Sequence, residues 1–205
     1  CAHMSPEIRY YAVFCFSALR SARSVPAVVE RLHDGDAGVR DIAVWVLEQY
    51  RGQPAFKAAV ERLREGLKEG PARRRRPIVD AVGRLHLAEA MPELIALLGD
   101  LGLGLQEAAH KALQEITRAD LGLDAWKWQK WLERNGNRPR IEWLLDGLLS
   151  DHRAIRSGAF AELRRVTHQN YGYLVDAPPA ERRSAHDRWV KWWRDAGMLR
   201  FAGYR

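Results

Sequence analysis

Hydrophobic positions along this chain recur at spacings of three and four residues, the period of an α-helix with one buried face. In its clearest form the pattern is an apolar residue, an arginine, a small residue three positions later and a large apolar residue four positions after that. It begins at Val39 and Ile155, and looser copies begin at Ile8, Arg74 and Leu105. No stretch shows the alternation typical of a β-strand. The sequence therefore predicts an all-α chain.

Cap and turn residues divide the chain into short helices. Ser5-Pro6 is a helix start signal, and Pro26 and Pro92 suit the first turn of a helix. We expect helices at about 5–22, 25–33, 37–51, 54–69, 72–86, 89–99, 103–118, 124–135, 138–149, 153–167 and 180–196. Asp34-Gly35-Asp36 and Asp100-Leu101-Gly102 are expected to separate the helices of a pair.

The helices are repeated as pairs. A shift of 66 residues places residues 8–50 on residues 74–116, with apolar and proline positions in register. A repeated helical pair predicts an α-solenoid, here of about five hairpins, in which each unit packs on its neighbours. Within a unit, Asp34 is expected to cap the following helix, Arg40 to reach a neighbouring unit's acid or helix end, and Ala43 to allow close helix packing.

Tryptophan marks a second kind of repeat after residue 116. A shift of 50 places Thr117 and Gly122 on Thr167 and Gly172, and a shift of 61 places a later Trp-x-x-Trp pair on its copy. The second copy thus carries eleven extra residues within 174–184. Tryptophans three apart share one helix face and favour a core role. We expect this role for Trp128, Trp131, Trp189 and Trp192, and partial exposure for Trp126 and Trp193.

These repeats resemble the HEAT repeats of short bacterial type found in phycobilisome-lyase-like proteins. The resemblance rests on the unit from Leu32 to Leu47, with Asp34 and the Val39-Arg40 pair, and it weakens where Gln106 replaces the arginine. Separately, residues 1–4, Cys1-Ala2-His3-Met4, look like a remnant of cloning. The remaining chain is expected to consist of plain HEAT-like repeats over 5–116 and extended, Trp-bearing repeats over 117–205, continuous with the first part.

The resemblance also implies that the helix beginning with the Val-Arg pair lines a concave surface. On 37–51 the buried set should be Val39, Ile42, Ala43, Val46 and Leu47. Asp41, Trp45 and Glu48 are then left on the opposite face, with Tyr10 and Phe14 beside Trp45. Exposed aromatic rows mark interaction surfaces. We expect Tyr10, Phe14, Asp41 and Trp45 to bind a partner, unless an upstream repeat covers them.

The chain is basic, with 33 Lys and Arg against 26 Asp and Glu, a formal net charge of +7. Arg73 to Arg76 form the densest cluster, and at most two of them share the groove. Arg75 and Arg76 are therefore expected as secondary partner contacts. The alternative for this run is a solvated helix start.

Metal and catalytic motifs are absent from the sequence. The seven histidines show no His-x-x-x-His spacing, and Cys15 lies within an apolar helix without a basic partner. We expect no enzyme activity, no cofactor and no metal. Tyr10–Leu19, the most apolar run, is shorter than a membrane span, and the chain is expected to be cytoplasmic.

Three functions stay open at this point. The first is a non-catalytic scaffold or adaptor that binds another protein on its concave face. The second is nucleic-acid binding, because HEAT-like glycosylases that excise alkylated bases are also basic and helical, and Trp45 with Asp41 or Asp80 could imitate their site. Asp41, Glu48 and Glu107 oppose phosphate binding there. The third is a structural spacer between domains.

Overall fold

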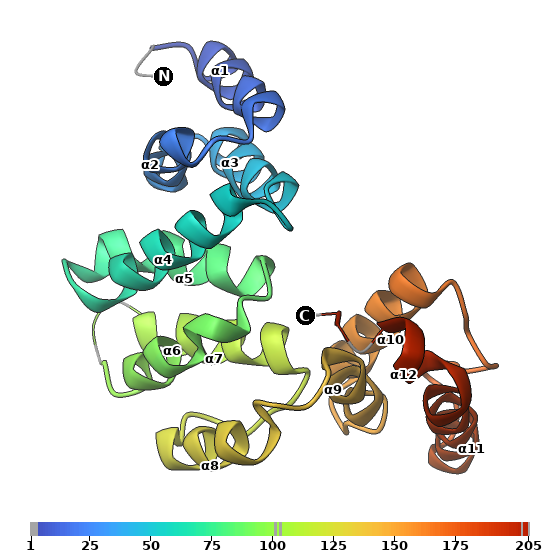
Figure 1. Cartoon of the computed structure of the whole chain (residues 1–205). Coiled ribbons are helices and arrows are strands. Elements are labelled where there is room, and N and C mark those ends of the chain that lie inside the picture. Colours follow the sequence, from blue (N-terminus) through green and yellow to red (C-terminus); the bar gives the residue numbers. More distant parts are fainter. Residues whose placement is uncertain (1–3, 101, 103, 202, 205) are drawn as a thin grey trace. The chain divides into compact units, whose positions relative to one another are not determined.

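The computed structural model describes residues 4–100, 102, 104–201 and 203–204 (Figure 1). The first three residues of the expected cloning remnant, and Leu101 of the second predicted turn, lie outside the described residues. The chain divides into two compact units, Cys1–Ala112 and Leu113–Arg205. The division falls inside a helix, four residues before the predicted change of repeat type.

Unit 1 consists of helical pairs joined by short turns. Its elements are α1 (Pro6–Leu19), η1 (Ala22–Ser24), α2 (Val25–Glu30), η2 (Arg31–His33), α3 (Ala37–Gln49), α4 (Pro54–Lys68), α5 (Ala72–Arg84), η3 (Ala88–Ala90), α6 (Met91–Leu97) and the first part of α7 (Leu105–Thr117). Unit 2 contains the end of α7, then α8 (Ala125–Asn135), α9 (Arg140–Gly147), α10 (Arg153–Thr167), α11 (Pro179–Trp192), η4 (Trp193–Gly197) and α12 (Met198–Phe201).

The all-α prediction is confirmed, since the described residues contain helices and no strand. Each of the eleven expected helices is present. Two of them, 25–33 and 89–99, are shorter α-helices flanked by a 3-10 turn. Pro26 and Pro92 lie in the first turns of α2 and α6, as expected. The terminal helix α12 was not predicted.

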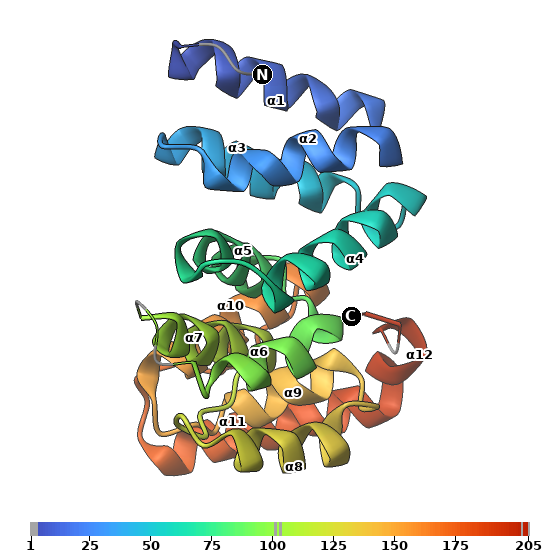
Figure 2. The same cartoon turned by 90° about the vertical axis from the view of Figure 1, so that its left-hand side faces the viewer.

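The helices of unit 1 pack in two layers, the arrangement of an α-solenoid. α1 packs on α3, while α2 packs on α4 and α4 on α6. Figure 2 shows the hairpins α2–α3 and α4–α5 one below the other, with α1 above them. The recurring pattern explains this packing, because Val39, Ala43 and Leu47 are all fully buried. The small side chain of Ala43 lets the neighbouring helix approach closely.

Asp34 does not cap α3, contrary to the prediction. Asp36 is the cap, and its Oδ1 accepts a hydrogen bond from the backbone N–H of Val39 at 3.0 Å. Asp34 instead accepts from the guanidinium of Arg9 on α1, at 2.7 and 2.9 Å. The reason is position: Asp36 directly precedes α3, whereas Asp34 lies two residues earlier and faces the preceding repeat.

Arg40 also differs from its predicted role. Its Nη1 donates to the backbone oxygens of Asp34 and Gly35, in the turn before its own helix. Arg156 makes the equivalent bonds to Ser150 and Asp151. Each of these arginines thus stabilises the turn before its own helix by donating to the carbonyl groups of that turn. Gln106, which departs from the pattern, also donates to a carbonyl group, that of Leu98.

Unit 2 contains two copies of one loop, in the register that the shift of 50 predicts. The hydroxyl of Thr117 donates to the carbonyl of Leu113, and that of Thr167 donates to Leu163, each at 2.7 Å. In both loops an Asp or Asn side chain then accepts from a glycine N–H at 3.0 Å. Both glycines have positive φ, 66° at Gly122 and 68° at Gly172, which explains why glycine recurs there.

The tryptophans of unit 2 are mainly core residues. Trp128 and Trp189 are fully buried, as predicted, and Trp126 is exposed, also as predicted. The expectation for Trp193 is wrong, because only 3% of it is exposed. The helix continues as the π-helical turn η4, which directs the indole towards α9, where its N–H donates to Glu142 at 3.1 Å.

A buried ionic network in unit 2 has no counterpart in the sequence prediction. The guanidinium of Arg140 on α9 binds both carboxylate oxygens of Glu162 on α10, and Arg118 adds a third contact at 3.1 Å. Arg140 and Glu162 are both buried. The Tyr204 hydroxyl completes the network at 3.1 Å from Glu162. This network ties the end of α7 and the C-terminal residues to the α9–α10 pair.

Candidate functional site: an exposed aromatic surface on α1 and α3

The predicted face of α3 is present in the structure. Asp41, Trp45 and Glu48 are exposed, while the five residues predicted to be buried on this helix are buried. Trp45 retains 42% exposure although it belongs to a helix with a well-packed opposite face. Its exposure follows from the helical period, because Trp45 stands half a turn away from Ala43 and Leu47.

Phe14 on α1 stacks on Trp45. Their ring centroids are 5.6 Å apart and the ring planes differ by 16°. Phe14 is 44% exposed, so both stacked rings keep apolar surface open to solvent. We call Phe14 and Trp45 the aromatic pair. Stacking fixes both side chains, which lowers the entropy lost when a ligand binds them.

Tyr10, the third residue of the predicted aromatic row, is half-buried. Its ring packs edge-on against Tyr11, with centroids 5.4 Å apart. Tyr10 therefore offers less surface than either member of the aromatic pair. It lies one helical turn before Phe14 on α1.

Two ion pairs flank the aromatic pair. Asp41 accepts from Arg84 of α5 at 2.7 Å, with both side chains exposed. Glu48 binds Arg51 through two hydrogen bonds of 2.8 Å, and Arg51 also donates to the carbonyl of Leu85. Both carboxylates next to Trp45 thus have a basic partner, and Asp41 is held against α5.

A second apolar face of α1 was missed at the sequence level. Ile8, Tyr11 and Leu19 are at least half exposed, and Cys15 is a free, exposed thiol. Cys15 therefore lies at the surface, although its apolar surroundings in the sequence suggested the interior. The signal was available, since these residues follow a spacing of three and four and form one stripe.

The two arginines predicted as secondary contacts are engaged within the protein. Arg75 is only 16% exposed and donates to Asp100 at 2.6 Å. Arg76 donates to the carbonyl of Gly104. Both arginines thus bind groups within unit 1, and Arg75 joins α5 to the turn before α7.

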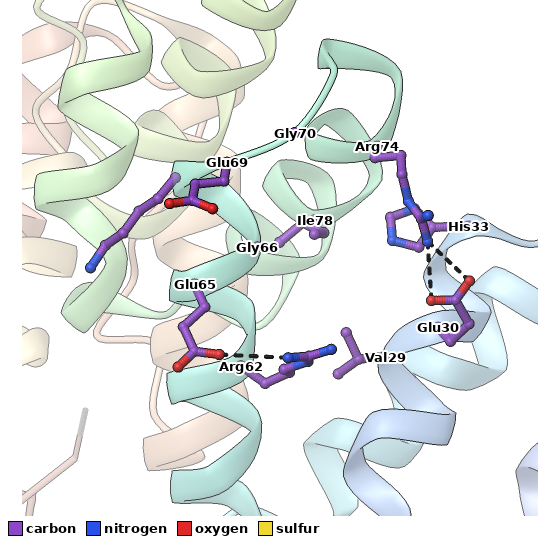
Figure 3. Close-up of a pocket in the computed structure, with 11 residues that line it drawn as sticks. Val29, Glu30, His33, Arg62, Glu65, Gly66, Glu69, Gly70, Arg74 and Ile78 are labelled. Carbon is purple, nitrogen blue, oxygen red and sulfur yellow. Dashed lines mark hydrogen bonds and ion pairs between the residues drawn. The ribbon is translucent and has the colours of Figure 1, made fainter.

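A pocket of about 570 Å³ opens on the α2 and α4 side of unit 1 (Figure 3). Its lining mixes bases and acids that neutralise one another: Arg74 binds Glu30 at 3.1 Å, and Arg62 lies 3.7 Å from Glu65. Ile78 packs closely against Gly66 in the wall of this pocket. A Cβ at position 66 would lie 2.5 Å from the Ile78 side chain, so a larger residue there would displace it. The charges leave no clear preference for a ligand of either sign.

Within the described part of the chain, no three His, Cys, Asp or Glu side chains group closely enough to hold a metal ion. Nor does any helix there combine the length and apolar character needed to cross a membrane.

A protein-family model matches the N-terminal part of the chain. No curated protein shows significant similarity to the chain. The segment that the family model matches, residues 1–81, contains α1 to α4 and most of α5. It therefore contains both residues of the aromatic pair. Residues 1–81 match the family model of HEAT repeats, in agreement with the paired helices of unit 1.

Proposed function

We propose that this protein is a non-catalytic binding module that recognises another protein through the face of α1 and α3 carrying the aromatic pair. The observation that carries the proposal is the stacking of two exposed aromatic side chains, Phe14 and Trp45, on adjacent helices. The resemblance to bacterial, phycobilisome-lyase-like HEAT proteins and a cytoplasmic location belong to the same proposal.

Energetics favour a binding role for the pair. An exposed, pre-ordered aromatic surface loses little rotamer entropy on contact, and the strongest contacts in protein interfaces are enriched in Trp, Tyr and Arg. The surrounding ion pairs, Asp41–Arg84 and Glu48–Arg51, would form a polar rim around this apolar centre. A structural spacer would have no use for such a surface.

Nucleic-acid binding is less well supported. A glycosylase-like site would need a carboxylate beside Trp45 that can act on the leaving sugar, whereas Asp41 is bound by Arg84. Glu48 adds a second negative charge next to the ring, which opposes the approach of phosphates.

The test is a pull-down with the whole chain and three variants. Trp45→Ala and Phe14→Ala should each lose a partner that the wild type retains, while the circular dichroism spectrum and melting temperature change little. Trp126→Ala, which removes an exposed tryptophan from unit 2, is the matched control and should retain the partner. Retention by all three variants would refute the proposed surface. Salt-sensitive capture of duplex DNA by the same face would favour the nucleic-acid alternative.

A further inference from the structure

A second, smaller hollow lies where the α2–α3 turn meets the start of α5. Its volume is about 330 Å³. Three arginines line it, Arg40 from α3 with Arg73 and Arg74 from α5, together with His33; Leu32 and Pro77 provide apolar wall. We call it the arginine hollow. It lies within unit 1 and contains neither residue of the aromatic pair.

The positive charge of the hollow is not offset by its one acidic lining residue. Asp34 is buried, and its carboxylate is already bound by Arg9, by Arg31 at 3.3 Å and by the backbone N–H of Asp36. The arginines hold the pKa of Asp34 below its usual value, so it stays ionised and paired. Burial, followed by the charge of Arg74, lowers the pKa of His33, which is therefore neutral near pH 7.

The arginines are poised for a new ligand. Arg40 is fixed in place because its Nη1 binds the carbonyl oxygens of Asp34 and Gly35 at 2.7 and 3.1 Å. Arg73 is exposed. Arg74 lies beside His33 and reaches Glu30 (Figure 3), but both members of that ion pair are more than half exposed. Such a pair is weak in water and can be exchanged for a stronger acceptor.

The arginines stand at a helix end where positive charge is unfavourable. Arg73 to Arg76 occupy the first turns of α5, which have no acidic residue, and the N-cap Pro71 provides no side-chain acceptor. The start of a helix carries partial positive charge, so four cations there repel it. Cations at the start of a helix are unfavourable by themselves, and such unfavourable placements are typical of functional surfaces. A bound anion would compensate the positive charge here.

We propose that the arginine hollow binds a phosphate monoester, the group carried by a phosphorylated serine or threonine of a partner protein. A monoester has up to two charges and three terminal oxygens, which match the paired N–H groups of neighbouring guanidinium groups. A nucleic-acid backbone is less suitable, since it needs a continuous basic track, and the adjoining pocket is interrupted by Glu30, Glu65 and Glu69.

The test uses NMR of the whole chain at constant ionic strength. Inorganic phosphate and a phosphoserine peptide are titrated separately, with the unphosphorylated peptide as reference. We expect saturable shifts of the His33 ring signals and of the backbone amides of Arg40 and Arg73. Arg73→Gln with Arg74→Gln should weaken binding by about tenfold or more, because charge-assisted hydrogen bonds are lost.

The matched control is Arg183→Gln, which removes an exposed arginine from unit 2 and should change the affinity by less than about twofold. Trp45→Ala should also keep phosphate binding, so this proposal can stand if the aromatic surface fails. Should the double variant unfold, Arg73→Gln alone is used, because this side chain is exposed.

Binding of both probes, lost in the arginine variants, supports a phosphorylated protein segment. Saturable binding of inorganic phosphate without the peptide would overturn the assignment to a partner protein and favour a small phosphorylated compound. Equal weakening in Arg183→Gln, or binding of duplex DNA without either phosphate probe, would overturn the proposal.

Discussion

The guanidinium of Arg9 lies 2.7 Å from the carboxylate of Asp34, and 66 residues later Arg75 lies 2.6 Å from Asp100. In both cases the acid also accepts a backbone N–H two residues ahead, from Asp36 or Gly102. The sequence duplication is therefore reproduced at the level of individual hydrogen bonds. Each pair joins one helix to the turn of the following hairpin and so links successive units.

Substituting Asp34 should destabilise unit 1 in a pH-dependent way. The hydrogen bond from Arg9 lowers the pKa of Asp34 in the folded chain. As the pH falls, the unfolded chain therefore takes up this proton first, and the stabilisation is lost on going through and below pH 4. We expect Asp34→Asn to lower the free energy of unfolding by about 1–2 kcal/mol at pH 7 and by much less at pH 3.

Urea unfolding at a series of pH values measures this effect. Asp80→Asn is the control, because Asp80 is exposed on α5 and its loss should change stability little at any pH. An Asp34→Asn effect of the same size at pH 7 and pH 3 would show that ionisation of the side chain is not the source of the stabilisation.

Breaking the buried network of unit 2 should lower the free energy of unfolding by more than the Asp34 substitution does. Glu162→Gln leaves the buried guanidinium of Arg140 without a counter-charge, and removing one partner of such a pair costs about 3–5 kcal/mol. Replacing both residues by apolar ones, Arg140→Met with Glu162→Leu, should cost less than the single change, because the two most buried charges of the network are removed together.

Thermal or urea unfolding followed by circular dichroism distinguishes these variants. The exposed pair Arg153–Asp176 is the comparison, and Arg153→Gln should be hard to tell from the wild type. A double substitution more damaging than Glu162→Gln would mean that Arg118 and Tyr204, the other partners of Glu162, depend on the complete network.

Alanine substitutions of Trp193 and of Trp126 should differ sharply in how much they lower the free energy of unfolding. Trp193 belongs to the core of α9, α10 and α11, so Trp193→Ala should cost about 3–5 kcal/mol, whereas Trp126→Ala on the surface of α8 should be nearly neutral. Chemical unfolding measures both. Similar losses of unfolding free energy in the two variants would contradict the burial of Trp193 in this core.

The sequence predicted the fold well because helical periodicity is a local property. The spacing of apolar residues decides which face of a helix is buried, and the burial of Val39, Ala43 and Leu47 and the exposure of Trp45 followed directly. Duplication also predicted the two Thr-containing loops, since equal residues at equal spacing make equal local hydrogen bonds. The stacking of Phe14 on Trp45 agrees with the repeat register.

Contacts between helices could not be predicted in the same way. The acid that caps α3, the partner of Arg9 and the burial of Trp193 depend on how one helix crosses another and on a π-helical turn. The ion pair of Arg140 and Glu162 joins residues 22 positions apart, a distance that carries no periodic signal. Sequence alone thus determined the helices and their buried faces, because both follow from neighbours along the chain. Only the tertiary structure decided which charged and aromatic side chains meet, because those contacts form across the packed helices.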